Sequence, residues 1–171
     1  ASENITAVNY EVGLKGMVTD EFSMSIAVFN TNYDDLPYQV STTSEAGFDT
    51  SNLVVKQTSR GIEWESTAYF TDNFKLHTSL GYIDVDVDEQ DGVKPVAPLT
   101  PKITASISPM YDFTLESGAS ISTRIDYSFR DKMYGEPSSD PGRLTEIESR
   151  ALVNFNINFT PAEGDWSVAL Y

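Results

Sequence analysis

Residues 119–130, ASISTRIDYSFR, contain the clearest alternation of apolar and polar side chains in the sequence. The odd positions carry Ala, Ile, Thr, Ile, Tyr and Phe, and the even positions carry Ser, Ser, Arg, Asp, Ser and Arg. A period of two with β-branched and aromatic residues on one side predicts a strand with one apolar and one polar face. Strands in globular proteins have about 5 to 6 residues, whereas a tilted strand crossing a bilayer needs about 9 to 11. The length of this segment therefore favours a membrane-spanning strand.

The same alternation recurs along the chain and predicts an all-β protein, an antiparallel up-and-down meander of about eight long strands. A change of parity before residue 61 predicts a β-bulge near residues 59–61. Pro109 is expected to interrupt the ladder of the fifth strand because it has no backbone N–H. The predicted strands are 9–19, 22–33, 61–71 with a less regular earlier part at 53–60, 74–82, 102–113, 119–130, 151–159 and 166–171.

The predicted connections alternate between short and long. Turns near residues 20, 72, 116 and 163 are short, whereas residues 34–52, 84–101 and 131–149 form long polar stretches. Outer-membrane barrels have short periplasmic turns and long extracellular loops, with aromatic residues at the membrane interfaces. Aromatic residues also gather beside the short turns: Phe22, Phe70, Phe74, Tyr111, Phe113, Phe159 and Trp166. These features predict strands of an outer-membrane β-barrel, with the three long loops outside the cell.

Charge and composition exclude several classes of protein. The formal net charge of −15 repels nucleic acid, so a nucleic-acid partner is not expected. No apolar run approaches the length of a transmembrane helix. The chain has no cysteine, which excludes disulfides, thiol chemistry and cysteine metal sites within it.

The acidic segment DVDVDEQDG, residues 84–92, superficially resembles a calcium loop because carboxylates occupy alternate positions. An EF-hand loop needs Gly at its sixth position and Glu at its twelfth, and counting from Asp84 these are Glu89 and Pro95. The spacing therefore favours a solvated acidic loop between Asp84 and Asp91 that loosely attracts divalent cations.

Other candidate residues favour structural roles. His77 is the only histidine, and its parity places it on the polar face of its strand. Glu63 and Glu65 share the polar face of another strand, and without a pocket they are charged lining and not an acid/base pair. We therefore predict no enzymatic activity and no catalytic, cofactor-binding or metal-binding residues. Charged side chains on the polar face of residues 119–130 are expected to pair with adjacent strands or with a plug domain: Arg124, Asp126 and Arg130.

Four motifs in order along the chain resemble the C-terminal barrel region of TonB-dependent outer-membrane receptors. They are GIEWESTAYFTDNF (61–74), PLTPKITASISPMYDF (98–113), RIDYSFRDKMYG (124–135) and DWSVALY (165–171). The resemblance implies a segment of a bacterial outer-membrane receptor that imports a scarce ligand of the siderophore, cobalamin or carbohydrate type. It also implies outer-membrane lipid, a plug domain and TonB as partners of the full-length protein.

The resemblance implies that residues 1–171 are one partial barrel domain, because the family's barrels have about 22 strands and about eight are predicted here. The plug, the early strands and the closing strand of the family are not recognisable. A soluble all-β ligand-binding barrel or sandwich remains the alternative, because it also has alternating strands. A closed eight-stranded membrane barrel is not favoured, because such barrels have both chain ends in the periplasm. Four short turns and three long loops place both ends of this chain on the long-loop side. We therefore predict an open, curved sheet whose first and last strands do not pair with each other.

Overall fold

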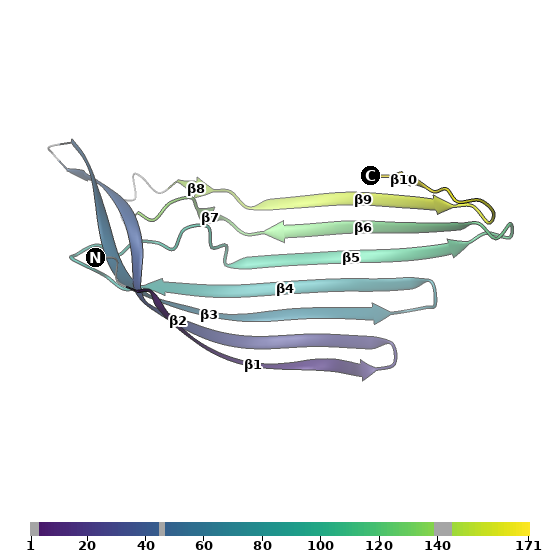
Figure 1. Cartoon of the computed structure of the whole chain (residues 1–171), viewed down its shortest axis with the longest axis horizontal. Helices are drawn as coiled ribbons and strands as arrows, with labels where there is room; N and C mark the ends of the chain where they lie inside the picture. Colours follow the sequence, from purple (N-terminus) through teal and green to yellow (C-terminus); the bar gives the residue numbers. More distant parts are fainter. Residues whose placement is uncertain (1–3, 45–46, 139–144) are drawn as a thin grey trace.

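The computed structural model describes residues 4–44, 47–138 and 145–171, and these form an all-β structure (Figure 1). No helix in these residues is long and apolar enough to cross a membrane. The strands are β1 (Thr6–Thr19), β2 (Phe22–Ser44), β3 (Gly47–Tyr69), β4 (Phe74–Val87), β5 (Ile103–Thr114), β6 (Ser120–Arg130), β7 (Met133–Tyr134), β8 (Glu146–Ile147), β9 (Arg150–Thr160) and β10 (Val168–Leu170).

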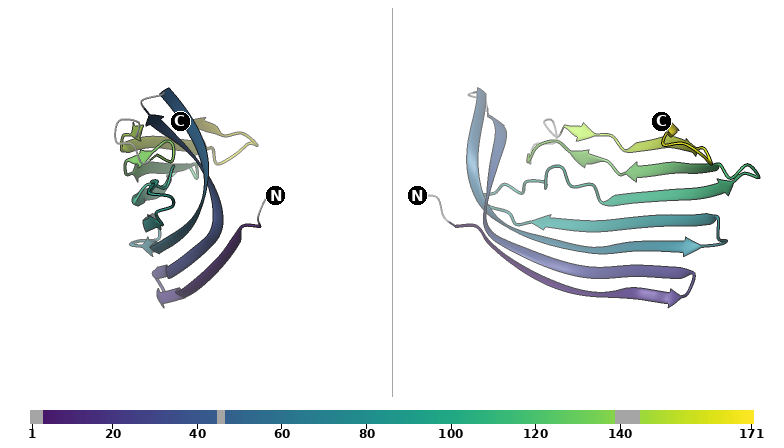
Figure 2. Two further views of the ribbon diagram at one scale, coloured as in Figure 1. Left: turned by 90° about the vertical axis from the view of Figure 1, so that its left-hand side faces the viewer. Right: turned by 45° about the vertical axis from the view of Figure 1, so that its right-hand side comes forward.

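Eight strands form one sheet in the order β1-β2-β3-β4-β5-β6-β9-β10, and each pairs antiparallel with the next. The predicted meander of about eight strands is confirmed. Within the described residues, β1 and β10 occupy opposite edges of the sheet, which is open and curved, as predicted (Figure 2). The short turns lie together at one end of the sheet, and the long connections, with the small β7–β8 ladder, lie at the other end (Figure 1).

The predicted loop at residues 34–52 is wrong, because β2 and β3 continue through most of it as a hairpin. Their ladder runs from Leu36 opposite Val55 to Ser44 opposite Gly47, and residues 45–46 lie outside the described part of the chain. This extension, which we call the distal hairpin (residues 36–44 and 47–55), bends across the long-connection end of the sheet (Figures 1 and 2). The polar composition of this segment led to the prediction of a loop, although its two strands are paired.

A β-bulge lies in β2 and not at residues 59–61 of β3. Tyr33 pairs with Gln57 and Leu36 pairs with Val55, so two residues of β2, Asp34 and Asp35, oppose one residue of β3. Asp35 has a φ of 59°, a left-handed conformation that Asp tolerates better than most residues. Through residues 59–61, β3 pairs without interruption with both β2 and β4. The predicted bulge site was therefore wrong.

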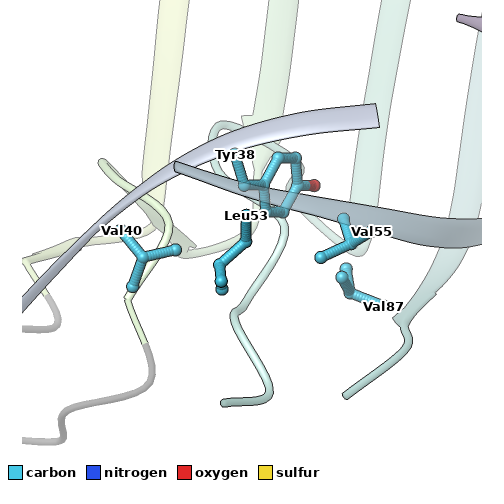
Figure 3. Packing of buried hydrophobic residues seen from close by; sticks show 5 residues of the cluster. All are labelled: Tyr38, Val40, Leu53, Val55 and Val87. Atoms are coloured by element: carbon cyan, nitrogen blue, oxygen red, sulfur yellow. The ribbon is translucent and has the colours of Figure 1, made fainter. Parts of the chain in front are cut away.

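The change of parity in β3 instead reflects a change of surroundings along one face. Leu53 and Val55 lie on the same face as Glu63 and Glu65. In the distal hairpin, however, side chains on that face are buried against one another and not exposed. Together with Tyr38 and Val40 of β2 and Val87 of β4 they form the buried hydrophobic cluster of the described residues (Figure 3). The apolar residues 83, 85 and 87 of β4 extend the same face towards this cluster.

The remaining strands agree closely with the sequence prediction. The β5–β6 ladder pairs Ile107 with Tyr127 and resumes at Met110 with Arg124, so Pro109 interrupts it as predicted. β4 extends to Val87, which moves the start of the second long connection from residue 84 to residue 88. The third long connection, residues 131–149, has the predicted bounds, although residues 139–144 lie outside the described part.

Candidate functional site

One face of the sheet is apolar from edge to edge, and its residues are aligned by the register of the ladders. Leu14 pairs with Ile26, Ile26 with Trp64, and Trp64 with Leu80. Across the other half of the sheet, Ile125 of β6 pairs with Phe155 of β9. Val12, Leu14 and Val153 are 79%, 73% and 67% exposed. We call this surface the outer face, and its extent is far beyond what a protein normally leaves to water.

Polar groups on the outer face are satisfied locally. The Ser66 and Thr78 hydroxyls on neighbouring strands hydrogen-bond to each other at 2.7 Å. Thr123 donates its hydroxyl to the backbone carbonyl of Tyr111 at 3.1 Å. Local partners of this kind suit hydrocarbon, in which an unsatisfied polar group costs several kcal/mol.

Six of the seven aromatic residues predicted beside the short turns pack in two groups, Phe70 to Phe113 and Phe159 with Trp166. The ring centroids of Phe70 and Phe74 are 5.4 Å apart, and those of Phe74 and Tyr111 are 6.2 Å apart. Tyr111 and Phe113 approach to 4.5 Å. Phe159 and Trp166 extend the series at the β9–β10 turn with a separation of 5.8 Å. This row has the arrangement of an interfacial aromatic girdle.

The opposite surface, the inner face, carries the polar residues considered in the sequence analysis. Glu63 and Glu65 are exposed and share this face of β3, as their parity predicted. His77 lies beside Thr67 of β3, and its Nδ1 is 3.1 Å from the Thr67 hydroxyl. This places His77 on the polar surface, as predicted.

Arg124 and Asp126 of β6 pair with each other and not with a charged side chain on a neighbouring strand, which was one of the two predicted alternatives; pairing with a plug domain stays a prediction. Arg124 forms an ion pair at 2.7 Å with Asp126 of its own strand, not with a carboxylate on a neighbouring strand. Asp126 also accepts a hydrogen bond from the Ser108 hydroxyl of β5. Arg130 donates to the backbone carbonyl of Glu148 at 2.7 Å. Arg124 and Asp126 lie two residues apart on the same face of β6, close enough to form an ion pair with each other.

Two carboxylates of the acidic segment at residues 84–91 form ion pairs with lysines. Asp84 pairs with Lys102 at 3.3 Å and Asp86 with Lys94 at 2.8 Å. A tight turn closes the segment through the backbone hydrogen bonds between Gln90 and Val93. Within the described part of the chain, no group of three or more His, Cys, Asp or Glu side chains is placed to hold a metal ion. Whether the segment attracts cations loosely stays a prediction.

A cavity of about 460 Å³ lies beside this segment at the long-connection end. Its walls come from the end of β4, the connection before β5 and the connection after β6, including Val85, Val96 and Met133. Leu99 donates its N–H to the Tyr134 carbonyl at 2.7 Å, which ties the two connections together. No sequence motif predicted this cavity; the signal that the sequence offers is the concentration of lysines in and beside the two connections.

An apolar outer face, a polar inner face, aromatic residues at the short turns and long connections opposite are the features expected of strands from an outer-membrane β-barrel. The model of the family described as "TonB dependent receptor-like, beta-barrel" matches residues 3–171. The chain belongs to this family of outer-membrane receptors, and the predicted resemblance is confirmed. A comparison with curated protein sequences finds no match.

Solved receptors share the fold at low sequence identity. The ferric preacinetobactin receptor BauA from Acinetobacter baumannii is 17% identical with a TM-score of 0.70, over 95% of this chain and 24% of that one. The pyoverdine receptor FpvA from Pseudomonas aeruginosa is 18% identical with a TM-score of 0.69, over 98% and 25%. The ferric yersiniabactin receptor FyuA from Yersinia pestis is 16% identical with a TM-score of 0.68, over 91% and 22%. The chain thus spans about a quarter of the length of these receptors.

Proposed function

We propose that this chain is part of the barrel of an outer-membrane receptor that imports a scarce ligand with energy supplied through TonB. The observation that carries the proposal is the separation of two surfaces across the whole sheet. Ile125 lies on an apolar face that suits lipid, and its neighbour Arg124 lies on a polar face that suits an aqueous lumen. This separation favours the membrane protein over the soluble binding module, whose apolar face would need a protein core against it.

The polar inner face supports a plug domain as a partner of the full-length protein. Glu63, Glu65 and Arg150 are exposed on this surface. Barrels of about 22 strands enclose a wide lumen that a plug fills, and charged groups on the wall can pair with groups on that plug. The ligand is proposed to be a small molecule of the siderophore, cobalamin or carbohydrate type, since the family consists of import receptors and the solved relatives include siderophore receptors.

The orientation of the barrel predicts which turns can be labelled from outside the cell. Since the chain has no cysteine, Asp91→Cys in the second long connection and Asp72→Cys in a short turn each introduce the only thiol of this segment. We expect a maleimide-polyethylene glycol too large to cross the outer membrane to label position 91 on intact cells. Position 72 should be labelled only after permeabilisation. Labelling of position 72 alone on intact cells would reverse the proposed topology.

Transport is tested with the full-length receptor in cells that lack competing receptors. Radioactive ferric siderophores, cobalamin and labelled oligosaccharides serve as the probes, each measured with and without a functional TonB system. We expect at least one probe to accumulate against its gradient only when TonB is functional. Accumulation that is unchanged without TonB would contradict the proposed mechanism, because a passive pore needs no energy coupling.

A further inference from the structure

A groove of about 850 Å³ lies on the outer face across β1, β2, β3 and β4, towards the long-connection end. Its floor is one row of the sheet, in which Val12 pairs with Val28 and Val28 pairs with Ile62. Tyr10 of β1 and Tyr82 of β4 flank this row from the two outer strands of the four, and both side chains are exposed. An aliphatic floor between two aromatic side chains suits a hydrocarbon chain, which gains dispersion contacts in a groove.

Polar side chains occupy the end of the groove nearest the long connections. Arg60 pairs in register with Asn30 on one side and Asp84 on the other, and its Nε donates a hydrogen bond to the Asn30 side-chain oxygen at 3.2 Å. Arg60 is exposed, and the ion pairs found within the described residues do not include it. A guanidinium group has five N–H donors in a planar fork that matches a phosphate. The donors that Asn30 does not use are therefore available to an anion.

In a membrane-spanning barrel, the position of Arg60 along β3 corresponds to an interface. From Phe70, among the aromatic residues at the short turns, the chain advances about 33 Å to Arg60 at about 3.3 Å per residue. At the usual strand tilt of about 40°, this corresponds to about 25 Å along the membrane normal, which is the height of the apolar band of an outer-membrane barrel. Lipid headgroups lie just beyond the hydrocarbon. Arg60 is therefore expected to lie level with the phosphates of the leaflet nearest the long connections.

The local charge at this end of the groove is positive, although the chain as a whole has a formal net charge of −15. Asp84 is paired with Lys102 at 3.3 Å, so its charge is balanced before Arg60 is counted. Glu11 also lines the groove, but it alternates with Val12 on β1 and belongs to the inner face. An anionic headgroup that most of the surface repels is therefore attracted to Arg60.

We propose that this groove binds a phosphorylated membrane lipid, with an acyl chain on the floor of Val12, Val28 and Ile62 and the phosphate on Arg60. The acyl chain contacts the floor and the two flanking tyrosine rings, and the phosphate oxygens accept hydrogen bonds from the guanidinium group. The inference rests on the proposed function only in placing the outer face in lipid. It adds a lipid site on the outside of the barrel, separate from the ligand proposed for import.

The test uses full-length receptor in lipid nanodiscs, carrying Leu14→Cys as its only cysteine and labelled there with the fluorophore NBD. Leu14 lies on the outer face beside the floor of the groove, one row nearer the short turns. The probes are phosphatidate and phosphatidylcholine with identical nitroxide-labelled acyl chains, because a nitroxide quenches a nearby fluorophore. We expect phosphatidate to bind at this position about fivefold or more tightly than phosphatidylcholine, because its headgroup carries net negative charge.

The substitution Arg60→Ala should lower this ratio of affinities to about one. Arg60→Lys, which keeps the charge but loses the planar fork, should lower it only in part. Lys56→Ala is the matched control and should leave the ratio unchanged, because Lys56 is an exposed basic residue of the same strand and parity that lies outside the groove. Millimolar inorganic phosphate should also leave it unchanged, whereas displacement of the lipid by phosphate would show a site for the free anion and not for a lipid.

A further variant, Ile62→Trp, fills the floor of the groove and should reduce quenching by phosphatidate to the level of phosphatidylcholine. Each variant is first shown to be a folded barrel by its heat-dependent mobility in gel electrophoresis. Equal affinity for the two lipids in the unaltered receptor, a ratio unchanged by Arg60→Ala, or an equal loss in Lys56→Ala would each overturn the inference. Equal quenching by both lipids refutes the lipid site alone. No quenching by either lipid also contradicts the proposed function, because Leu14 would then not face lipid.

Discussion

Replacing Ile125 with arginine is expected to destabilise the full-length receptor in a bilayer by about 2 to 4 kcal/mol. Ile125 occupies the middle of β6 and pairs with Phe155 on the outer face, so we expect its side chain to lie near the bilayer midplane. The penalty arises because a guanidinium group at that depth loses its hydration without gaining a partner. The measurement is reversible denaturant unfolding of the receptor from lipid vesicles, followed by tryptophan fluorescence.

The matched control is Ser122→Arg in the same strand. Ser122 lies on the inner face, where it pairs with Asp112 and Asn158. An arginine there remains in the polar lumen and should change the free energy of unfolding by less than about 1 kcal/mol, as for most surface substitutions. Equal destabilisation by the two variants would show that the two faces do not meet different solvents, and the proposed lipid-facing surface would have to be abandoned.

The second large effect is expected from Val40→Asp in the distal hairpin. Val40 is fully buried in the cluster with Leu53 and Val55, so the new carboxylate would be buried without a partner (Figure 3). That costs several kcal/mol, enough to shift the docked hairpin towards an undocked state by more than about a hundredfold. Protease added to intact cells should then cleave within residues 36–55 much faster than in the unaltered receptor, while the rest of the sheet stays protected.

Val54→Asp is the control variant: it adds the same negative charge to the distal hairpin without burying it. Val54 lies between two cluster residues on the same strand, but its side chain is 47% exposed on the other face of the hairpin. A carboxylate there stays in water, so the cleavage rate should be close to that of the unaltered receptor. Slow cleavage in both variants would mean that the cluster does not hold the distal hairpin in place.

The spanning part of the sheet was predictable from sequence because it lies between two different solvents. Each strand must turn one parity to an apolar medium and the other to water, and this requirement is visible in most residues of β6 and β9, with Thr123 and Leu152 as exceptions. The short turns and their aromatic residues were predictable for a related reason. They mark the depth at which the apolar medium ends.

Outside the spanning part of the sheet, the strands no longer lie between an apolar medium and water, so the alternation of side chains no longer applies. The predictions for the distal hairpin and the long connections were less accurate for this reason. In the distal hairpin the buried face is the continuation of the polar inner face, so Leu53 and Val55 change chemistry without any change in backbone parity. Sequence alone suggested a bulge in β3, whereas the register places it at Asp34 and Asp35 of β2. A polar composition likewise indicated a loop where two strands pair, since backbone hydrogen bonds between strands do not depend on apolar side chains.

The sequence by itself determined the fold class, the order of the strands in the sheet and the face on which each spanning residue lies. Alternation over long segments is a local property that neighbouring residues decide. Only the tertiary structure decided that Lys94 meets Asp86, that Lys132 meets Glu146, and that both lie around one apolar cavity. These contacts join connections far apart in the chain, and their geometry follows from how the sheet curves and where the connections cross it, which no local pattern records.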